Sequence, residues 1–164
     1  MKRIGILSDT HTYVHPEMER IFSACDEIWH AGDFGNMETV AALQAMKPLR
    51  GVYGNVDSQE IRAVFPRVAR FFCEEVDVLI THIGGYPGRY ESGILEIMKV
   101  KPPDLFISGH SHILKVMPDK RFNLLHINPG AAGKQGLHHK ITFVRFVIDG
   151  KTIQDLEVVE FNKI

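Results

Sequence analysis

Short apolar runs alternate with segments of helical periodicity through the first two thirds of the chain, and this alternation limits the possible folds more than any other feature. The predicted elements follow one another as a strand at 3–8, a helix at 16–25, a strand at 27–31, a helix between Asn36 and Pro48, and a strand at 49–53. Repeated strand–helix–strand units of this kind are typical of layered α/β folds.

The second half of the chain changes from this alternation to strands that are joined by turns. Asp149-Gly150 lies between two apolar runs and is a strong signal for a hairpin. An antiparallel ending after parallel units predicts an α/β sandwich with mixed sheets. The predicted elements here are strands at 68–72 and 76–81, a helix at 91–100, and strands at 105–108, 124–127, 141–148 and 152–161.

The length of 164 residues suits one domain, which we expect to span residues 1–164. A net charge of −1 gives no electrostatic case for a dedicated nucleic-acid-binding surface, and no apolar stretch is long enough to cross a bilayer. Cys25 and Cys73 form no CxxC pair, which favours free thiols in a reducing cytoplasm. We expect a cytoplasmic protein without membrane partners, whose 141–161 hairpin either pairs with a second copy or covers a sheet edge.

Polar side chains follow the predicted strands at the points where these strands end. In open α/β sheets, ligands bind beyond the carboxyl ends of the strands, because the loops diverge there and leave backbone groups free. Five strand ends that carry Asp, His or Asn therefore predict one shared site. The residues are Asp9 and His11, Asp33, Asn55, His82, and His110 and His112.

These side chains suit a particular kind of metal site. Imidazole and carboxylate ligands together fit Mn²⁺, iron, Ni²⁺ or Zn²⁺, and the absence of thiolate ligands argues against a structural Cys-zinc site. Two metal ions ~3.5–4 Å apart can stabilise both the attacking and the leaving oxygen of an in-line phosphoryl displacement. Asp33 is the natural bridge between two ions, since a carboxylate has two oxygens.

The same residues fall into a series of short motifs. In chain order these are Asp9-x-His11, Gly32-Asp33, Gly54-Asn55-x-Asp57, His82 and Gly109-His110-x-His112. The series resembles that of the calcineurin-like metallophosphoesterases, and more closely that of their small bacterial and archaeal branch of single-domain phosphodiesterases. The resemblance spans roughly residues 3–133 and includes Asn128-Pro129-Gly130. It implies a four-layer α/β-β/α sandwich, with two mixed sheets packed face to face and metals at the carboxyl ends of the strands.

The resemblance also implies a role for each residue. Asp33, Asn55 and His82 are the implied catalytic side chains, and the implied nucleophile is a hydroxide between two divalent metal ions. Mn²⁺ is the expected metal, with Ni²⁺, Fe²⁺ and Zn²⁺ as alternatives. The implied ligands are Asp9, His11 and His112 for the first ion and Asn55, His82 and His110 for the second, with Asp33 between them.

One position departs from the pattern of the wider superfamily. Many members have a histidine after the Gly-Asn pair, and this side chain is thought to protonate the leaving oxygen or to steady the phosphate. This chain has Val56 there, which can do neither. We therefore expect a preference for diesters with good leaving groups.

Three further residues are candidates for supporting roles. Asp57 either orients a metal ligand or, with Ser58, forms a turn before a helix. Arg89 and Lys134 lie in glycine-rich segments that follow His82 and Asn128, and these segments are either plain turns or loops that contact the substrate.

The resulting hypothesis is a metal-dependent phosphodiesterase that acts on a small-molecule phosphodiester. Two alternatives remain. A phosphomonoesterase or nucleotide hydrolase would use the same side chains. A non-catalytic scaffold would share only the fold, as in a eukaryotic retromer subunit that has a degraded metal site. The complete set of seven expected ligands favours an enzyme over a scaffold.

Overall fold

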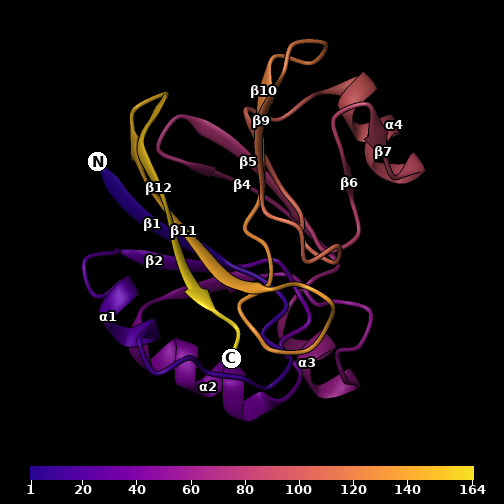
Figure 1. The fold of residues 1–164 in the computed structure, drawn as a ribbon. Helices are drawn as coiled ribbons and strands as arrows, with labels where there is room; N and C mark the ends of the chain where they lie inside the picture. The colour runs from indigo at the N-terminus through magenta and orange to yellow at the C-terminus, as the bar shows by residue number, and fades with distance from the viewer.

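The computed structural model describes residues 1–164 and contains two five-stranded sheets packed face to face (Figure 1). In the first sheet the strand order is β12-β11-β1-β2-β3. Strands β1, β2 and β3 run parallel to one another, β11 is antiparallel to β1, and β12 is antiparallel to β11. Its strands are β1 (Lys2–Leu7), β2 (Glu27–His30), β3 (Leu49–Gly51), β11 (Lys140–Asp149) and β12 (Thr152–Asn162).

The second sheet has the same mixed character. Its order is β4-β5-β8-β10-β9, and β5, β8 and β10 form the parallel centre between two antiparallel edge strands. The strands are β4 (Val68–Cys73), β5 (Val76–Thr81), β8 (Leu105–Ile107), β9 (Lys115–Asp119) and β10 (Leu124–Asn128). A short hairpin of β6 (Gly85–Tyr86) and β7 (Arg89–Tyr90) stands apart from both sheets.

Apolar side chains from both sheets fill the space between them. Fifteen buried residues form this core, with Ile4, Ile6 and Trp29 from the first sheet and Val78 and Ile107 from the second. Burial of this apolar surface holds the sheets together, because each Å² removed from water contributes roughly 25 cal/mol of stabilising free energy. The strands of each sheet are therefore fixed relative to those of the other.

Helices cover the outer faces of the sandwich. Helices α1 (Met18–Phe22), α2 (Met37–Met46) and α3 (Gln59–Val64) lie on the side of the first sheet, and α4 (Ser92–Val100) lies beside the second (Figure 1). The predicted four-layer sandwich with two mixed sheets is thereby confirmed. None of these helices has the length and apolar character that a helix needs to cross a bilayer.

Some predicted elements differ from those in the structure. The first helix spans only Met18–Phe22 instead of 16–25, because Glu17 gives it no side-chain cap and the Ser23 hydroxyl bonds back to the Arg20 carbonyl at its end. The β6–β7 hairpin was not predicted, and helix α3 was expected only in the alternative in which Asp57 and Ser58 precede a helix, since two and six residues are too few to show a period.

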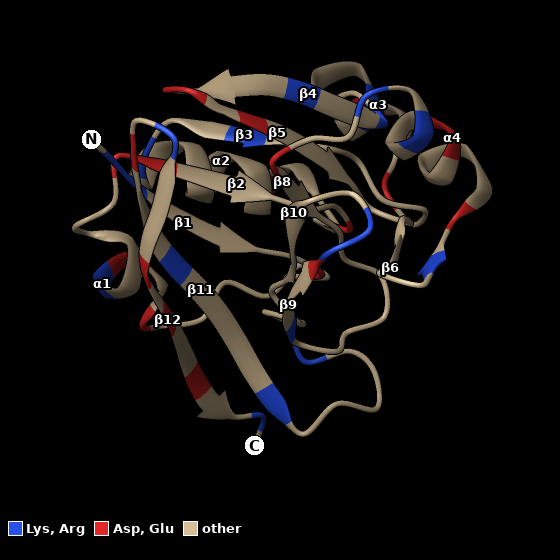
Figure 2. Ribbon diagram, turned by 90° about the horizontal axis from the view of Figure 1, so that it is seen from above, with Lys and Arg blue, Asp and Glu red and all other residues tan.

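Strand β12 forms an edge of the first sheet, so pairing of the 141–161 hairpin with a second copy stays a prediction. Seen from above, Lys and Arg positions are interspersed with Asp and Glu positions along the ribbon (Figure 2).

Candidate metal centre

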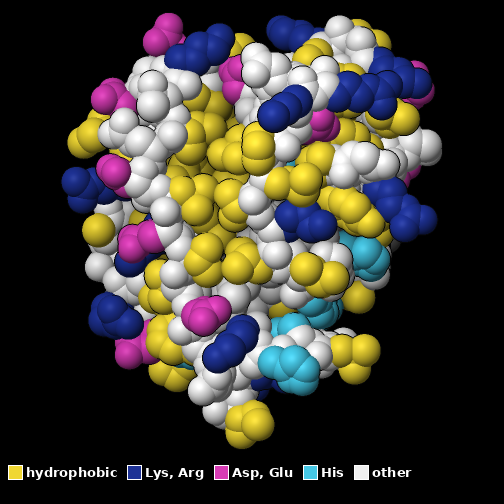
Figure 3. All heavy atoms as spheres, turned by 45° about the horizontal axis from the view of Figure 1, so that its top comes forward, with side chains coloured by type: hydrophobic (Ala, Val, Ile, Leu, Met, Phe, Trp, Pro, Cys, Tyr) yellow, Lys and Arg dark blue, Asp and Glu magenta, His cyan; other side chains and the backbone are white.

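The carboxyl ends of the parallel strands of both sheets meet at one edge of the sandwich. The loops after β1, β2 and β3 come from the first sheet, and those after β5 and β8 come from the second. In Figure 3, histidine side chains gather at one margin of the face shown. Two groups of potential metal ligands form at this edge, Asp9, His11 and His112 in one and Asp33, His82 and His110 in the other.

The first group is built around a buried carboxylate. Asp9 Oδ1 lies 3.2 Å from His112 Nε2 and 3.7 Å from His11 Nε2. The other oxygen, Asp9 Oδ2, accepts hydrogen bonds from the Ser8 hydroxyl at 2.6 Å and from the His110 backbone N–H at 3.1 Å. The protein thus occupies one oxygen of Asp9 and leaves the other directed at the two imidazoles.

The second group repeats this arrangement. Asp33 Oδ2 lies 3.1 Å from His82 Nε2, and the potential ligand atoms of Asp33, His82 and His110 all lie within 4.8 Å of one another. Asp33 Oδ1 accepts the Val56 backbone N–H at 3.1 Å. Asp33 Oδ2 is the oxygen that lies near the imidazoles of the cluster.

The two groups are adjacent. Asp33 Oδ2 is 3.6 Å from His11 Nε2, and Asp9 Oδ1 is 3.8 Å from His82 Nε2. Asp33 therefore lies between the groups, as a bridging residue must. Its role as a bridge between two ions stays a prediction.

Three buried polar atoms of the cluster have no hydrogen-bond partner, namely Asp9 Oδ1, His11 Nε2 and His82 Nε2. Buried polar atoms normally have partners, so a group of three requires an explanation. His82 Nδ1 lies 2.7 Å from the Ala31 carbonyl oxygen, which can only accept, so we assign the ring proton to Nδ1 and a lone pair to Nε2. A metal-binding histidine commonly donates its other N–H in this way. The residues present fit divalent cations.

The electrostatics also favour anionic carboxylates. Burial alone would raise the pKa of Asp9, but the nearby imidazoles of His11 and His112 outweigh this effect and hold the pKa well below its ordinary value. The pKa of Asp33 is lowered as well, because His82 overcomes the same effect of burial. Both carboxylates therefore stay ionised at neutral pH, which is the form that binds a cation.

The backbone at this edge is unusual. Five residues of the two groups have left-handed backbone angles: Asp9 (φ 55°), His11 (44°), Asp33 (61°), His110 (72°) and His112 (63°). Such conformations cost non-glycine residues about 1–3 kcal/mol each, and they concentrate at functional sites. The loops are thus bent so that these side chains face the same point.

Two motif glycines permit close packing of the loops. A Cβ atom at Gly54 would collide with the Asp33 carboxylate, and one at Gly109 would collide with the Ser8 hydroxyl. Any larger residue at either position would push the loop away from the carboxylate that it supports. These two close contacts explain why the Gly-Asn and Gly-His motifs begin with glycine.

Asp57 joins the loops that follow β2 and β3. Its carboxylate accepts backbone N–H groups of Asp33 at 3.0 Å, Gly35 at 3.0 Å and Gly54 at 2.8 Å. Ser58, not Asp57, caps α3 by accepting the Ile61 N–H. Both interpretations of Asp57 hold. Its carboxylate orients the loop that carries Asp33, and its own N–H closes a turn on the Gly54 carbonyl at 3.2 Å, just before α3.

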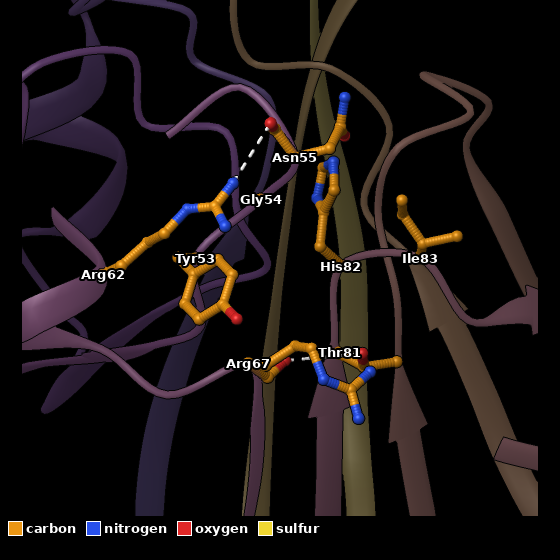
Figure 4. A pocket seen from close by; sticks show the side chains of 8 residues that line it. All are labelled: Tyr53, Gly54, Asn55, Arg62, Arg67, Thr81, His82 and Ile83. Carbon is orange, nitrogen blue, oxygen red and sulfur yellow. Dashed lines mark hydrogen bonds between the residues drawn. The ribbon is translucent and has the colours of Figure 1, made fainter. Parts of the chain in front are cut away.

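Two cavities adjoin the candidate centre, one lined by His82 and the other by His110. One of about 260 Å³ is lined by Asn55 and His82 among others, and Figure 4 shows these two side chains next to each other. A second of about 250 Å³ is lined by His110 and Arg89. Lys134 lines neither cavity, and its ammonium lies over the Tyr13 ring instead. Arg89 thus lines a cavity beside the centre, and the role of Lys134 as a substrate contact stays a prediction.

Several residues beside the centre were not predicted from the sequence. Tyr53, Arg62 and Arg67 line the first cavity, although nothing in their local sequence distinguishes them from other surface residues. The His138 ring lies 5.2 Å from the His112 ring, and its buried Nδ1 has no partner. Its only sequence signal was its residue type.

Comparison with known proteins agrees with this geometry. A sequence profile of the calcineurin-like phosphoesterase superfamily domain matches residues 1–151. A probable metallophosphoesterase of Methanothermobacter thermautotrophicus is 29% identical over 164 residues, which cover 95% of this chain and 91% of that protein. An archaeal phosphodiesterase superposes with a TM-score of 0.76 at 22% identity, over 96% of this chain and 99% of its own. Vps29 of Chaetomium thermophilum also has a TM-score of 0.76, at 16% identity over 100% of both chains.

Proposed function

The chain belongs to the calcineurin-like phosphoesterase superfamily, and we propose that it acts as a metal-dependent phosphodiesterase on small phosphodiesters. The observation that carries the proposal is the set of unpartnered buried atoms on Asp9, His11 and His82, which face one another across two adjacent ligand groups. Such atoms are costly to bury unless they bind something. An archaeal phosphodiesterase of the same fold supports this choice.

We assign two divalent ions to these residues. Asp9, His11 and His112 would hold one, Asn55, His82 and His110 the other, and Asp33 Oδ2 would contact both. Bound divalent ions supply Lewis acidity, which neutralises charge on phosphoryl oxygens and lowers the pKa of water. All donors are nitrogen or oxygen, which suits Mn²⁺, with Ni²⁺, Fe²⁺ and Zn²⁺ as alternatives.

The chain's own residues position the substrate. Asn55 lies at the surface beside His82, where its amide can donate to a phosphoryl oxygen. The two cavities that flank the centre share Ile83 at their border. A phosphodiester has two organic arms and a monoester has one, so two cavities beside the centre favour diesters.

The proposal is tested with bis(p-nitrophenyl) phosphate and protein stripped of metal. Hydrolysis is expected to be absent from the stripped protein and to appear when Mn²⁺ is added. If Mn²⁺, Ni²⁺, Fe²⁺ and Zn²⁺ all fail to produce hydrolysis, the proposal is wrong. Faster turnover of p-nitrophenyl phosphate or of nucleoside triphosphates than of the diester would instead assign a phosphomonoesterase or a nucleotide hydrolase.

The reaction rate is expected to depend steeply on the acidity of the leaving alcohol. The Val56 side chain is 50% exposed at the position where many superfamily members carry histidine, and it cannot donate a proton. Hydrolysis of aryl phosphodiesters with graded substituents should slow sharply as the leaving-group pKa rises. Val56→His should flatten this dependence, whereas Val64→His, at a 49% exposed valine of α3, should leave it unchanged. A flat dependence in the unmodified protein would contradict the prediction.

A scaffold role is the second candidate function. Vps29 shares the fold, and Figure 3 shows a broad area of apolar side chains on one face. A scaffold has no need of unpartnered ligand atoms at the strand ends, which is why we place it second. Complete absence of hydrolysis with every metal would favour it.

We place the protein in the cytoplasm. Cys25 and Cys73 are both buried and unpaired, and burial raises the pKa of each thiol above its ordinary value. Free thiols of this kind are typical of a reducing compartment.

A further inference from the structure

The cavity of about 260 Å³ next to His82 has a chemical character of its own. It lies between the end of β3, the start of β4 and the end of β5, and Figure 4 shows its side chains. Because Asn55 and His82 line it as well, a group that fills it is continuous with the candidate metal centre. The lining consists of Tyr53, Gly54, Asn55, Arg62, Arg67, Thr81, His82 and Ile83, with no carboxylate among them.

Two arginines of this cavity are not paired with acids. Elsewhere in the chain Arg50 pairs with Glu27, Arg70 with Asp77 and Arg145 with Glu157, at 2.6 to 2.9 Å. Neither Arg62 nor Arg67 forms a salt bridge. A guanidinium presents planar, paired donors that match the oxygens of phosphate or carboxylate. Two unpaired guanidinium groups in one cavity therefore favour an anionic ligand.

The position of Arg62 is fixed by its neighbours. Its Nε donates to the Asp57 carbonyl at 2.9 Å, its Nη2 donates to the Asn55 carbonyl at 3.3 Å, and its guanidinium lies over the Tyr53 ring at 4.6 Å. The side chain is thereby held against the loop that carries Asn55. It adds positive charge to the cavity without being free to move.

Arg67 differs, because its side chain is exposed and makes no hydrogen bond within the protein. The Tyr53 backbone N–H donates to the Pro66 carbonyl at 3.0 Å, which keeps the residue before Arg67 against the β3 loop. The carboxylate of nearby Glu91 accepts the Gly93 and Ile94 N–H groups at the start of α4, and these bonds lower its pKa more than the charge of Arg67 does. Arg67 thus lines the cavity with its guanidinium donors available.

We propose that this cavity binds a second phosphate, carried on one arm of the phosphodiester substrate, and that Arg67 is the residue that recognises it. The proposal rests on the phosphodiesterase function proposed above and names its substrate class: diesters with a further phosphate, such as those that join phosphorylated nucleosides. The cavity is smaller than the ~300–1,000 Å³ of pockets that enclose a whole ligand, so it suits one arm of the substrate.

Binding of thymidine 3′,5′-bisphosphate to the Mn²⁺-loaded protein tests the proposal by calorimetry. Either phosphate of this probe can lie at the metals while the other enters the cavity. We expect the bisphosphate to bind at least about tenfold more tightly than thymidine 5′-phosphate or thymidine 3′-phosphate, because one charge-assisted hydrogen bond contributes about that much affinity. Equal affinities for the three ligands would overturn the proposal.

Substitutions at two exposed arginines separate recognition from general charge. Arg67→Met should reduce the preference for the bisphosphate to less than about twofold, and Arg67→Lys should retain part of it, because lysine keeps the charge but not the paired donors. Arg121→Met is the control, since Arg121 stacks on Phe122 and lines neither cavity beside the centre. It should keep the full preference. If Arg121→Met lowers the preference as much as Arg67→Met, the cavity is not the site.

Hydrolysis of bis(p-nitrophenyl) phosphate, measured on the same preparations, distinguishes the two proposals. If the preference for the bisphosphate depends on Arg67 but no hydrolysis is seen, the proposed phosphate site stands and the proposed phosphodiesterase function is wrong. Hydrolysis without the preference would retain the enzyme and reject the phosphate site.

Discussion

Replacement of Asp33 by asparagine is expected to reduce metal-dependent hydrolysis by at least about 10³-fold. Asp33 Oδ2 is the one carboxylate oxygen of this residue that faces both ligand groups, at 3.1 Å from His82 Nε2 and 3.6 Å from His11 Nε2. The substitution removes the negative charge that would hold two cations together. The fold should survive, because the asparagine carbonyl can still accept the Val56 N–H and asparagine tolerates left-handed backbone. Initial rates and the number of metal ions bound per chain check this prediction.

A closely matched control exists for this substitution. Asp155 is exposed and also has a left-handed backbone, with φ of 54°, but it belongs to β12 and is not part of either ligand group. Asp155→Asn should therefore retain full activity and metal content. If Asp33→Asn kept more than a tenth of the activity with two ions bound, Asp33 would not be the bridging residue.

Asp57→Ala is expected to lower the free energy of unfolding by about 3–5 kcal/mol. Three backbone N–H groups from two loops donate to this one buried carboxylate, and alanine would leave all three without a partner. Activity should fall as well, because the loop that carries Asp33 loses the group that orients it. Urea unfolding monitored by fluorescence of Trp29 measures the change in stability.

Asp26→Ala provides the comparison for Asp57→Ala. The Asp26 carboxylate accepts a single backbone N–H, that of Arg3, in an exposed position. Its removal should cost about 1 kcal/mol or less. Equal losses in the two variants would show that Asp57 has no special role in joining the loops.

The sequence predicted the position of the site because two simple patterns coincide. Apolar runs mark the parallel strands, and polar residues such as Asp9 and His82 follow directly at their ends. Since parallel strands of one sheet end at one edge, chain order indicates that the side chains after β1 and β2 converge, and likewise those after β5 and β8. That the two sets also meet each other follows from the packing of the two sheets. The same argument applies to His110 and His112, which follow β8.

Other parts of the site depend on contacts between segments that are distant in the sequence. Arg67 reaches the centre only because the start of β4 packs beside the β3 loop, and no local pattern records that packing. The support of Asp33 Oδ1 by the Val56 amide joins two residues that are 23 positions apart in the sequence. Helix α3 is six residues long, so Ser58 as a cap was its only local signal.

The left-handed backbone at five residues of the two groups has a consequence for stability. Glycine adopts such angles without penalty, so Asp9, His11, Asp33, His110 and His112 together hold back about 5 kcal/mol or more of stability. That amount is comparable with the entire stability of many domains. Glycine at these positions would relieve the strain but would remove the side chains that face one another. The geometry of the cluster is thus maintained against the local preference of its own backbone.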